Sequence, residues 1–242
     1  MTDTTYPEGC AVVIGASGGI GRALTQQIVA SGRFGAVHAL SRSGARAPDG
    51  ATGGRIDLED EASIAEAAAR LAPPPRLVII ASGRLHGPGL TPEKALRTLN
   101  PAAMHQAFAV NAVGPALVAK HFTPLVPREG RSVFAALSAR VGSIGDNRLG
   151  GWHSYRASKA ALNMLIATIA IELARTRPAA LCVGLHPGTV DTGLSKPFQA
   201  GVPEARLFTA DQSAGHLLRV VDGLGPADSG GLFAWDGARI PA

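Results

Sequence analysis

The sequence contains very few cysteines. Only Cys10 and Cys182 occur among its 242 residues, and each lies at or within an apolar segment that predicts a buried strand. Two isolated thiols in such segments are typical of core residues in the reducing cytoplasm. The seven histidines show no spacing typical of metal ligands, and we expect His153 and His186 to pack or bond locally. The sequence therefore predicts neither a disulfide nor a metal site.

Long apolar runs are also missing. The longest apolar stretch, residues 162–173, is interrupted by Asn163, Thr168 and Glu172, whereas a membrane-spanning helix needs about 20 predominantly apolar residues. The first residues show no basic segment followed by an apolar one, which is the pattern of an export signal. These two absences predict a cytoplasmic protein that is neither exported nor inserted into a membrane.

Acidic residues are fewer than basic ones. The chain has 23 lysines and arginines against 18 acidic residues, a formal net charge of +5 and an isoelectric point near 9.8. The arginines are dispersed, however, and aromatic residues make up only 5%, so the basic helices and interleaved aromatic residues of nucleic-acid-binding proteins are absent. We expect no nucleic-acid partner, and a phosphorylated cofactor would account for part of the positive excess.

Apolar β-rich segments alternate with helical ones along the chain, without a break in composition or an internal repeat. This alternation predicts an α/β protein with a Rossmann-type doubly wound parallel sheet of about seven strands and helices on both faces. We expect a single domain, residues 1–242, because α/β folds of this length are routinely one unit. The expected strands are residues 11–14, 36–40, 55–57, 77–81, 132–137, 181–186 and 232–235, and the expected helices are 20–30, 61–71, 101–122, 152–175 and 210–221. Thr209 and Gln212 predict a capping box at the last helix.

Tyr155 and Lys159 lie four positions apart in a strongly helical segment and therefore share one helix face. A free tyrosine loses its proton near pH ~10, so it acts as an acid or base at neutral pH only if a nearby positive charge stabilises the phenolate. Lys159 could supply that charge. The same spacing is common on solvated helix faces, so the pair needs support from the rest of the chain.

That support comes from a glycine-rich turn. The apolar segment ending at Ile14 runs into Gly15, Gly19 and Gly21 and then into a helical sequence. Strand, glycine turn and helix are the context of a phosphate-binding loop, in which unpaired N–H groups at the helix N-terminus meet the pyrophosphate. Residues 15–19 also satisfy the G-x-S-x-G pattern of a hydrolase with Ser17 as nucleophile. Ser17 follows the first strand of the chain, which is too early for the hydrolase fold.

The end of the second expected strand indicates the cofactor. The strand over residues 36–40 is followed by Ser41, Arg42 and Ser43, with no carboxylate. An acidic residue at this position would bond the adenosine ribose of NAD(H), whereas an arginine accommodates the 2′-phosphate of NADP(H). The sequence therefore predicts NADP(H) in preference to NAD(H).

Together, the Gly-x-x-x-Gly-x-Gly turn and the Tyr-x-x-x-Lys pair resemble the short-chain dehydrogenase/reductase family over essentially the whole chain. Residues 138–143, with Gly-Gly-Trp before Ser-Tyr-Arg, resemble the branch of sniffer-type carbonyl reductases and C-factor-like bacterial proteins. The resemblance implies a homodimer or homotetramer that pairs through helices 101–122 and 152–175. It also implies cofactor contacts from Gly15, Ser17, Gly19, Ile20, Gly21, Ser41, Arg42, Asp57, Leu58, Ala81, Ser82, Gly83, Asn111, Tyr155, Lys159, Pro187, Gly188, Val190 and Thr192.

The sequence departs from the family at the catalytic serine. The family has a Ser-Ser-x-x-Gly run in which the second serine is normally catalytic, whereas this chain has Ser138 followed by Ala139. The resemblance therefore implies that Ser138 takes this role, with Ser143 as a weaker candidate. Asn111 matches the asparagine that in the family distorts a long helix and holds a water in a proton relay to the lysine.

The resemblance implies hydride transfer between the nicotinamide and a carbonyl or alcohol substrate. Tyr155 would act as general acid or base, Lys159 would lower its pKa and hold the nicotinamide ribose, and Ser138 would polarise the carbonyl. Residues 193–207 are punctuated by glycine and proline, which predicts a substrate lid. The competing interpretation is a non-catalytic NADP(H)-binding sensor or signalling protein on the same fold, which Ala139 favours.

Overall fold

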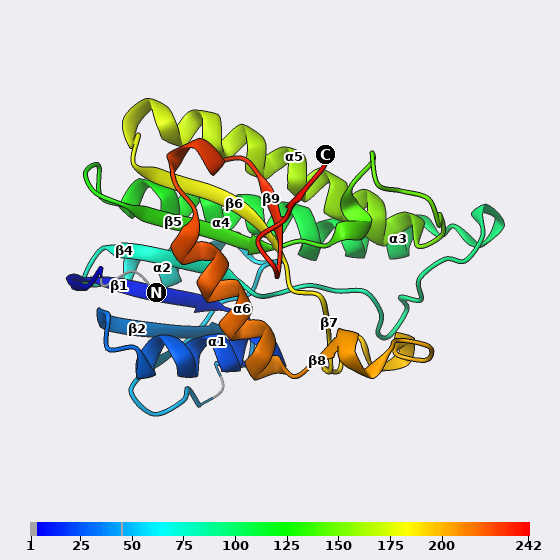
Figure 1. Ribbon diagram of the computed structural model, residues 1–242, viewed down its shortest axis with the longest axis horizontal. Coiled ribbons are helices and arrows are strands. Elements are labelled where there is room, and N and C mark those ends of the chain that lie inside the picture. The colour runs from blue at the N-terminus through cyan, green and yellow to red at the C-terminus, as the bar shows by residue number, and fades with distance from the viewer. Residues whose placement is uncertain (1–3, 45) are drawn as a thin grey trace.

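The computed structural model describes residues 4–44 and 46–242 (Figure 1). Its main sheet has eight strands in the order β10-β9-β6-β5-β4-β1-β2-β3, which contains the 3-2-1-4-5-6 order of a Rossmann fold. In this order, all neighbouring strands between β9 and β3 pair in parallel, and β10 pairs antiparallel with β9. The strands are β1 (Tyr6–Ile14), β2 (Phe34–Ser41), β3 (Thr52–Arg55), β4 (Pro75–Ile80), β5 (Ser132–Leu137), β6 (Ala180–His186), β9 (Leu232–Ala234) and β10 (Arg239–Ile240).

The predicted Rossmann-type fold is confirmed, with two corrections to the sheet. β10 is an eighth, antiparallel strand of two residues, too short for an apolar alternation to reveal it. The strand expected at residues 55–57 lies instead at Thr52–Arg55, because Thr52 to Arg55 pair with His38 to Ser41 of β2. Residues 56–58 therefore follow the strand, at the edge of the sheet where the carboxyl ends meet.

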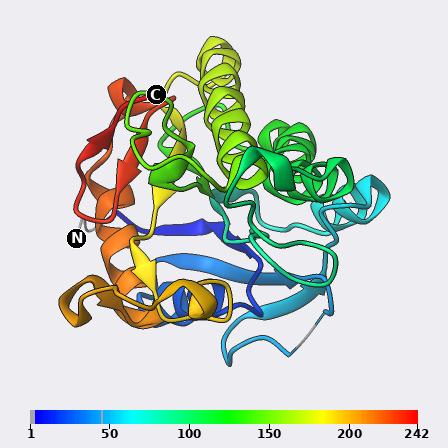
Figure 2. The same cartoon turned by 90° about the vertical axis from the view of Figure 1, so that its right-hand side faces the viewer.

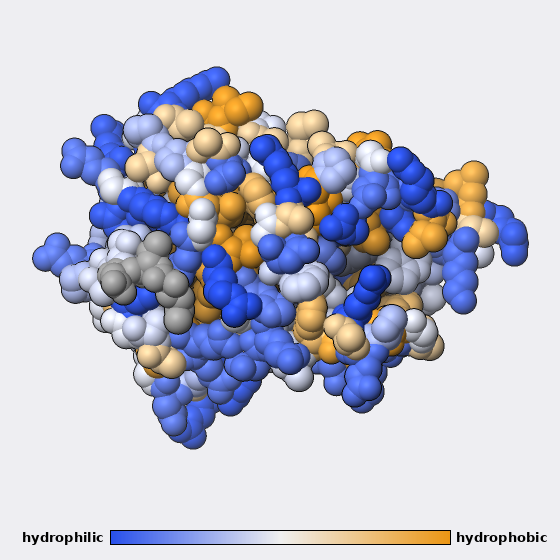
Figure 3. Space-filling view, viewed as in Figure 1, coloured by the Kyte–Doolittle hydropathy of each residue, from blue (hydrophilic) through white to orange (hydrophobic). Residues whose placement is uncertain are grey.

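Helices cover both faces of the sheet, and Figure 2 shows the two layers. One apolar core joins the sheet to α1 (Gly19–Ala30) and α6 (Ala210–Gly223). The other joins it to α2 (Glu61–Ala69), α4 (Gly114–Phe122) and α5 (His153–Thr176). The inner strands are buried on both sides, which explains their continuous apolar sequences. On the face of Figure 1, apolar residues form small areas among hydrophilic ones (Figure 3).

The helix expected over residues 101–122 is interrupted. It divides into α3 (Pro101–Phe108), a π-helical turn at Ala109–Val113 and α4. Asn111 occupies the middle of the π-helical turn and is completely buried. Single π-helical turns inside α-helices are frequent at functional sites. The turn directs the Asn111 side chain at the backbone of the loop that follows β4, where it bonds Arg84.

The start of α6 and the length of α5 bear on two other expectations. Thr209 and Gln212 form the predicted capping box, with each side chain bonded to the other's backbone N–H. By length and composition, α5 could cross a membrane. In the structure it packs against β6 and α3, and it buries Leu162, Ile166 and Leu173 in the core beside the sheet. One face of α5 therefore packs in the core, while Met164 and Ile171 of the same helix are exposed.

Candidate active site

A tight turn joins β1 to α1 at the carboxyl edge of the sheet. Gly15 has a φ of 89°, in the left-handed region that favours glycine. A Cβ at Gly21 would lie 2.2 Å from the carbonyl oxygen of Gly15, so only glycine lets α1 begin this close to the turn. The N-cap residue, Gly18, makes no side-chain capping bond, and the first turn of α1 contains no acidic residue. The N–H groups at this helix start therefore suit an anion.

Ser17 lies on this turn and is exposed. Among the residues that the structure describes, it makes no hydrogen bond to a histidine, whereas a nucleophilic serine needs an adjacent general base. The geometry therefore gives the hydrolase hypothesis no support.

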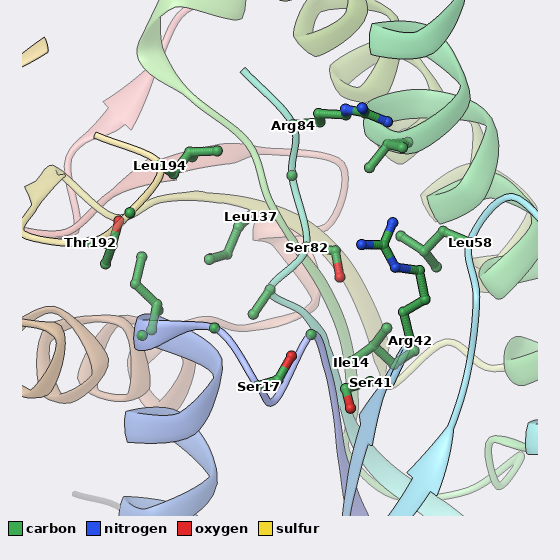
Figure 4. A pocket seen from close by; sticks show the side chains of 18 of the residues that line it. Ile14, Ser17, Ser41, Arg42, Leu58, Ser82, Arg84, Leu137, Thr192 and Leu194 are labelled. Carbon is green, nitrogen blue, oxygen red and sulfur yellow. The ribbon is translucent and has the colours of Figure 1, made fainter. Parts of the chain in front are cut away.

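A cavity of about 590 Å³ opens beside the turn (Figure 4). Figure 4 shows Arg42 reaching into it from the end of β2 and Thr192 approaching from the opposite side. Of the predicted site residues, the cavity is lined by Gly15, Ser17, Gly19, Ile20, Ser41, Arg42, Asp57, Leu58, Ala81, Ser82, Gly83, Ser138, Tyr155, Lys159, Pro187 and Thr192. Gly21, Asn111, Gly188 and Val190 are not part of its wall.

Tyr155 and Lys159 lie in the first two turns of α5, and the Lys159 Nζ is 5.8 Å from the centre of the Tyr155 ring. Lys159 is buried, and its Nζ donates a 2.7 Å hydrogen bond to the Leu137 carbonyl. Burial lowers the pKa of Lys159 from 10.5 to about 8 and raises the pKa of Tyr155 from 10.0 to about 12. The dominant influence on the phenol is thus burial, and the expectation that Lys159 lowers the pKa of Tyr155 stays a prediction. Tyr155 holds its proton at neutral pH.

Asn111 links the loop after β4 to α5. Its Oδ1 accepts from the Arg84 N–H at 2.8 Å, and its Nδ2 donates to the Arg84 carbonyl at 2.8 Å and to the Ser158 Oγ at 3.1 Å. A Cβ at Gly83 would lie 3.7 Å from both the Asn111 Oδ1 and the Lys159 Nζ. Asn111 therefore lies directly behind Gly83 and Lys159, which are part of the cavity wall. The expected bond from Asn111 to a relay water stays a prediction.

Ser138 lines the cavity, whereas Ala139 and Ser143 do not. The Ser138 Oγ donates a 2.6 Å hydrogen bond to the Oδ1 of Asn163, so its proton points at α5. The Asn163 Nδ2 is buried and has no partner among the described residues. Ser143 instead accepts a bond from the Asp146 N–H at 3.0 Å in its own loop. Of the two serines considered, Ser138 is thus the one that reaches the site.

The sequence model of the short chain dehydrogenase family matches residues 9–202. This chain is a short-chain dehydrogenase. The predicted family membership is thereby confirmed.

Two relatives and two solved structures illustrate the place of this short-chain dehydrogenase in its family. The chain is 37% identical to C-signal of Myxococcus xanthus over 61% of its own length and 83% of that protein. It is 30% identical to 1-hydroxy-2-glutathionyl-2-methyl-3-butene dehydrogenase of Rhodococcus sp. (strain AD45), over 95% of its own length and 97% of that protein. The NADPH-bound carbonyl reductase from chicken fatty liver superposes with a TM-score of 0.84 at 26% identity, covering 98% of this chain and 100% of that one. The carbonyl reductase Sniffer of D. melanogaster shares the fold, with a TM-score of 0.83 at 20% identity over 97% of this chain and 99% of that one.

The structure adds aromatic residues that sequence patterns did not indicate. Trp152, at the N-cap of α5, adopts a left-handed φ of 50°. Its ring lies edge-on to Tyr155, with centroids 6.2 Å apart, and to Phe198, at 5.0 Å. His86 contacts Phe198 at 5.7 Å, and its Nε2 lies 3.0 Å from the Gly193 carbonyl oxygen. These rings come from three separate segments, so no local spacing in the sequence could have shown that they meet.

A small parallel sheet connects the two ends of the segment predicted as a lid. β7 (Thr189–Val190) precedes it and pairs with β8 (Leu207–Phe208), so the two ends of residues 193–207 lie together. A Cβ at Gly19 would lie 2.9 Å from the Thr192 Cγ2, which places Thr192 against the glycine turn. Leu194 lines the cavity a little further along. The segment therefore reaches the cavity at its first residues.

Proposed function

We propose that this short-chain dehydrogenase is an NADP(H)-dependent oxidoreductase of carbonyl reductase type. The observation that carries the proposal is that Tyr155 and Lys159 line the same cavity as the glycine turn and Arg42. An acid, an anion-binding helix start and a guanidinium then serve one reaction centre. The similarity to a carbonyl reductase whose structure contains NADPH supports this assignment.

The residues present fit a phosphorylated dinucleotide. The uncapped helix start after Gly18 suits its pyrophosphate. Arg42 is exposed and makes no ion pair with the described residues, so its guanidinium is available for a 2′-phosphate beside Ser41. The adenine would lie against Asp57 and Leu58. Further along, Ala81, Ser82 and Gly83 would run beside the cofactor, and Thr192 would bond its carboxamide or a phosphate.

Tyr155 is the proton donor in the proposed reaction. When bound, NADPH supplies the hydride that adds to the carbonyl carbon. Negative charge then grows on the carbonyl oxygen, and the Tyr155 hydroxyl donates its proton to that oxygen, so an alcohol forms. The raised pKa of Tyr155 keeps this proton in place at neutral pH. Lys159, which lines the cavity, would hold the nicotinamide ribose. The oxidative direction is the reverse step, in which the Tyr155 phenolate accepts the proton of the alcohol.

Ser138 would polarise the substrate carbonyl once its hydroxyl no longer donates a hydrogen bond to Asn163. An asparagine amide keeps nearly the same shape when its oxygen and nitrogen exchange places. In the turned orientation, the Asn163 Nδ2 would donate to the Ser138 Oγ, and the serine proton could then point at a substrate oxygen. The unpartnered Nδ2 favours this second arrangement, because a buried amide donor without an acceptor costs about 1–3 kcal/mol.

For the substrate we propose a chemical class and the segment that would cover it. Residues 193–207 would act as a lid, and Leu194 and Phe198 favour a small hydrophobic ketone or aldehyde.

We further propose one dinucleotide-binding domain over residues 1–242 in a cytoplasmic protein. Val113 on the π-helical turn and Met164 and Ile171 on α5 are exposed apolar residues, which favours pairing of the long helices in a homodimer or homotetramer.

The test follows the absorbance of NADPH, and of NADH in parallel, while the purified protein is offered aldehydes, ketones and diketones. We expect NADPH to be oxidised with at least one carbonyl class and NADH to be oxidised more slowly. Faster oxidation of NADH would contradict the proposed role of Arg42. Tight NADPH binding without turnover on any carbonyl would contradict the enzyme.

That last result would favour a non-catalytic sensor, the second candidate function. One observation favours it: the Ser138 proton is directed at Asn163 and away from the cavity, while the neighbouring position is Ala139. Against it stands Tyr155, protonated and beside the cofactor-binding residues, which a sensor would not need.

A further inference from the structure

A second cavity lies at the opposite edge of the sheet, where the strands begin. It has a volume of about 430 Å³ and is bounded by the ends of α1 and α6 and by the first residues of β1, β4 and β5. Cavities of roughly 300–1,000 Å³ commonly hold small molecules. It shares no lining residue with the catalytic cavity in the part of the chain that the structure describes.

The charge around this cavity is predominantly positive. Its wall contains Arg33, Arg76, Arg131 and Arg219, but only one acidic residue, Asp222. Arg33 is neutralised by Asp222, since its Nη1 lies 2.8 Å from the Asp222 Oδ1. Three guanidinium groups are therefore left without a carboxylate among the lining residues.

These three arginines differ in how strongly the protein already engages them. Arg131 donates to carbonyl oxygens at the end of α6, and Arg76 donates to the Glu129 carbonyl at 2.6 Å. Carbonyl dipoles offset a positive charge only in part. The Arg219 side chain is exposed and makes no hydrogen bond or ion pair with residues 4–44 and 46–242. Its guanidinium is thus the one most available to an anion.

Tyr6 supplies a second, independent observation. Its hydroxyl is buried and has no hydrogen-bond partner among the described residues. Its ring stacks on Phe34, with centroids 5.4 Å apart, and the Arg76 guanidinium lies 6.0 Å from the ring centre. Buried hydroxyls are normally hydrogen-bonded, and an orphaned one indicates a partner that the chain does not supply. The wall holding Tyr6 is therefore suited to a ligand with an acceptor oxygen.

Most of the rest of the wall is apolar, and its polar side chains, Gln27 and Ser31, are hydrogen-bonded within the chain. The apolar part includes Ile28, Leu77, Val133 and Leu218. A fully hydrated anion such as free phosphate would leave this surface uncovered, and burying its double charge would be costly. A singly charged head on an apolar body satisfies both parts of the wall, since guanidinium groups bind carboxylates well.

We propose that this cavity binds an apolar carboxylate, the anion of a medium-chain fatty acid. The carboxylate would accept hydrogen bonds from Arg219 and from the Tyr6 hydroxyl, and the chain would lie along the apolar wall. The site stands apart from the proposed reaction, because it rests on no residue of the catalytic cavity.

The test is isothermal titration of the full-length protein with decanoate. We expect one site per chain, with affinity unchanged by saturating NADPH. Arg219→Glu should weaken binding at least about 10-fold, because it replaces a charged donor with a like charge. Arg175→Glu is the matched control, since Arg175 is exposed on α5, outside the cavity wall, and it should retain the wild-type affinity.

Two further titrations keep the proposal falsifiable if Arg219→Glu folds poorly. Tyr6→Phe, which removes one oxygen atom, should weaken decanoate binding about 3-fold to 10-fold. Decanol, which has the same chain and no charge, should bind at least about 10-fold more weakly than decanoate. Displacement of decanoate by NADPH, wild-type affinity in Arg219→Glu or Tyr6→Phe, or equal binding of decanol would overturn the proposal.

Discussion

The two halves of the cavity beside the glycine turn are built in different ways. The proposed cofactor half is built from residues that directly follow two neighbouring strands, with Gly15 after β1 and Arg42 after β2. The proposed substrate half contains His86 and Tyr155, which lie far apart in the sequence, and Phe198 packs against His86 from a third segment. The first half depends on local backbone geometry and the second on long-range packing. Changes in the cofactor half should therefore alter cofactor affinity or stability, whereas changes at Tyr155 should alter chemistry alone.

The largest effect should come from Tyr155→Phe. Loss of the hydroxyl removes the proton donor, and general acid catalysis is typically worth about 10²–10⁴ in rate. We expect kcat/KM for carbonyl reduction to fall by about that factor, while the dissociation constant of NADPH, measured by fluorescence titration, stays within about 3-fold of wild type. A mutant that turns over at more than about a tenth of the wild-type rate would remove Tyr155 from the mechanism.

The next largest effect concerns stability in acid. Burial, together with the charge of Arg140, lowers the pKa of His186 from 6.5 to about 4, although Asp236 opposes the shift. The unfolded chain therefore takes up a proton as the pH falls below about 6.5, and the native state does so only near about 4. Stability should be complete above pH 6.5 and should decline by up to about 3 kcal/mol between pH 6.5 and 4.

Urea unfolding at several pH values checks this expectation. His186→Gln should flatten the decline, because it removes the group that the unfolded chain protonates. His105→Gln is the control, since His105 is exposed on the surface of α3. If wild type and His186→Gln lose stability in parallel, the acid sensitivity comes from other groups.

Arg42→Ala probes the cofactor half. A charge-assisted hydrogen bond contributes about 1.5–3 kcal/mol, so NADPH should bind about 10-fold to 100-fold more weakly. NADH carries no 2′-phosphate, and its affinity should change less than about 2-fold. Parallel titrations with both cofactors give the ratio directly. An equal loss of affinity for the two cofactors would show that Arg42 does not bind the 2′-phosphate.

A smaller effect is expected from crowding the glycine turn. Gly21→Ala would place its Cβ 2.2 Å from the Gly15 carbonyl, whereas Gly18→Ala would place its Cβ 3.4 Å from that atom. Overpacking typically costs about 1–3 kcal/mol, so the free energy of unfolding should fall by that amount in Gly21→Ala and by less than about 1 kcal/mol in Gly18→Ala. Equal stabilities would mean that α1 can shift away from the turn.

The same contrast between local geometry and long-range packing explains which features of the fold and site could be predicted from the sequence. The Rossmann-type fold, the glycine turn and the position of Arg42 follow from strand–turn–helix patterns within a few residues, and the structure brings these residues to one cavity. Trp152 and His86 were missed because their partners, Phe198 and Gly193, lie on a distant segment. The raised pKa of Tyr155 could not be foreseen, because it depends on burial that no i, i+4 spacing reveals. Asn163 was treated only as an interruption of an apolar run, although it holds the proton of Ser138.

The most direct test of the central claim is to trace the hydride. NADPH deuterated at C4, on the face that the enzyme uses, is incubated with the wild-type protein and its best carbonyl substrate, and the product is analysed by mass spectrometry. The account predicts an alcohol with one deuterium on the former carbonyl carbon, formed at least about 100-fold more slowly by Tyr155→Phe. An unlabelled product, or labelled product formed equally fast by Tyr155→Phe, would contradict it.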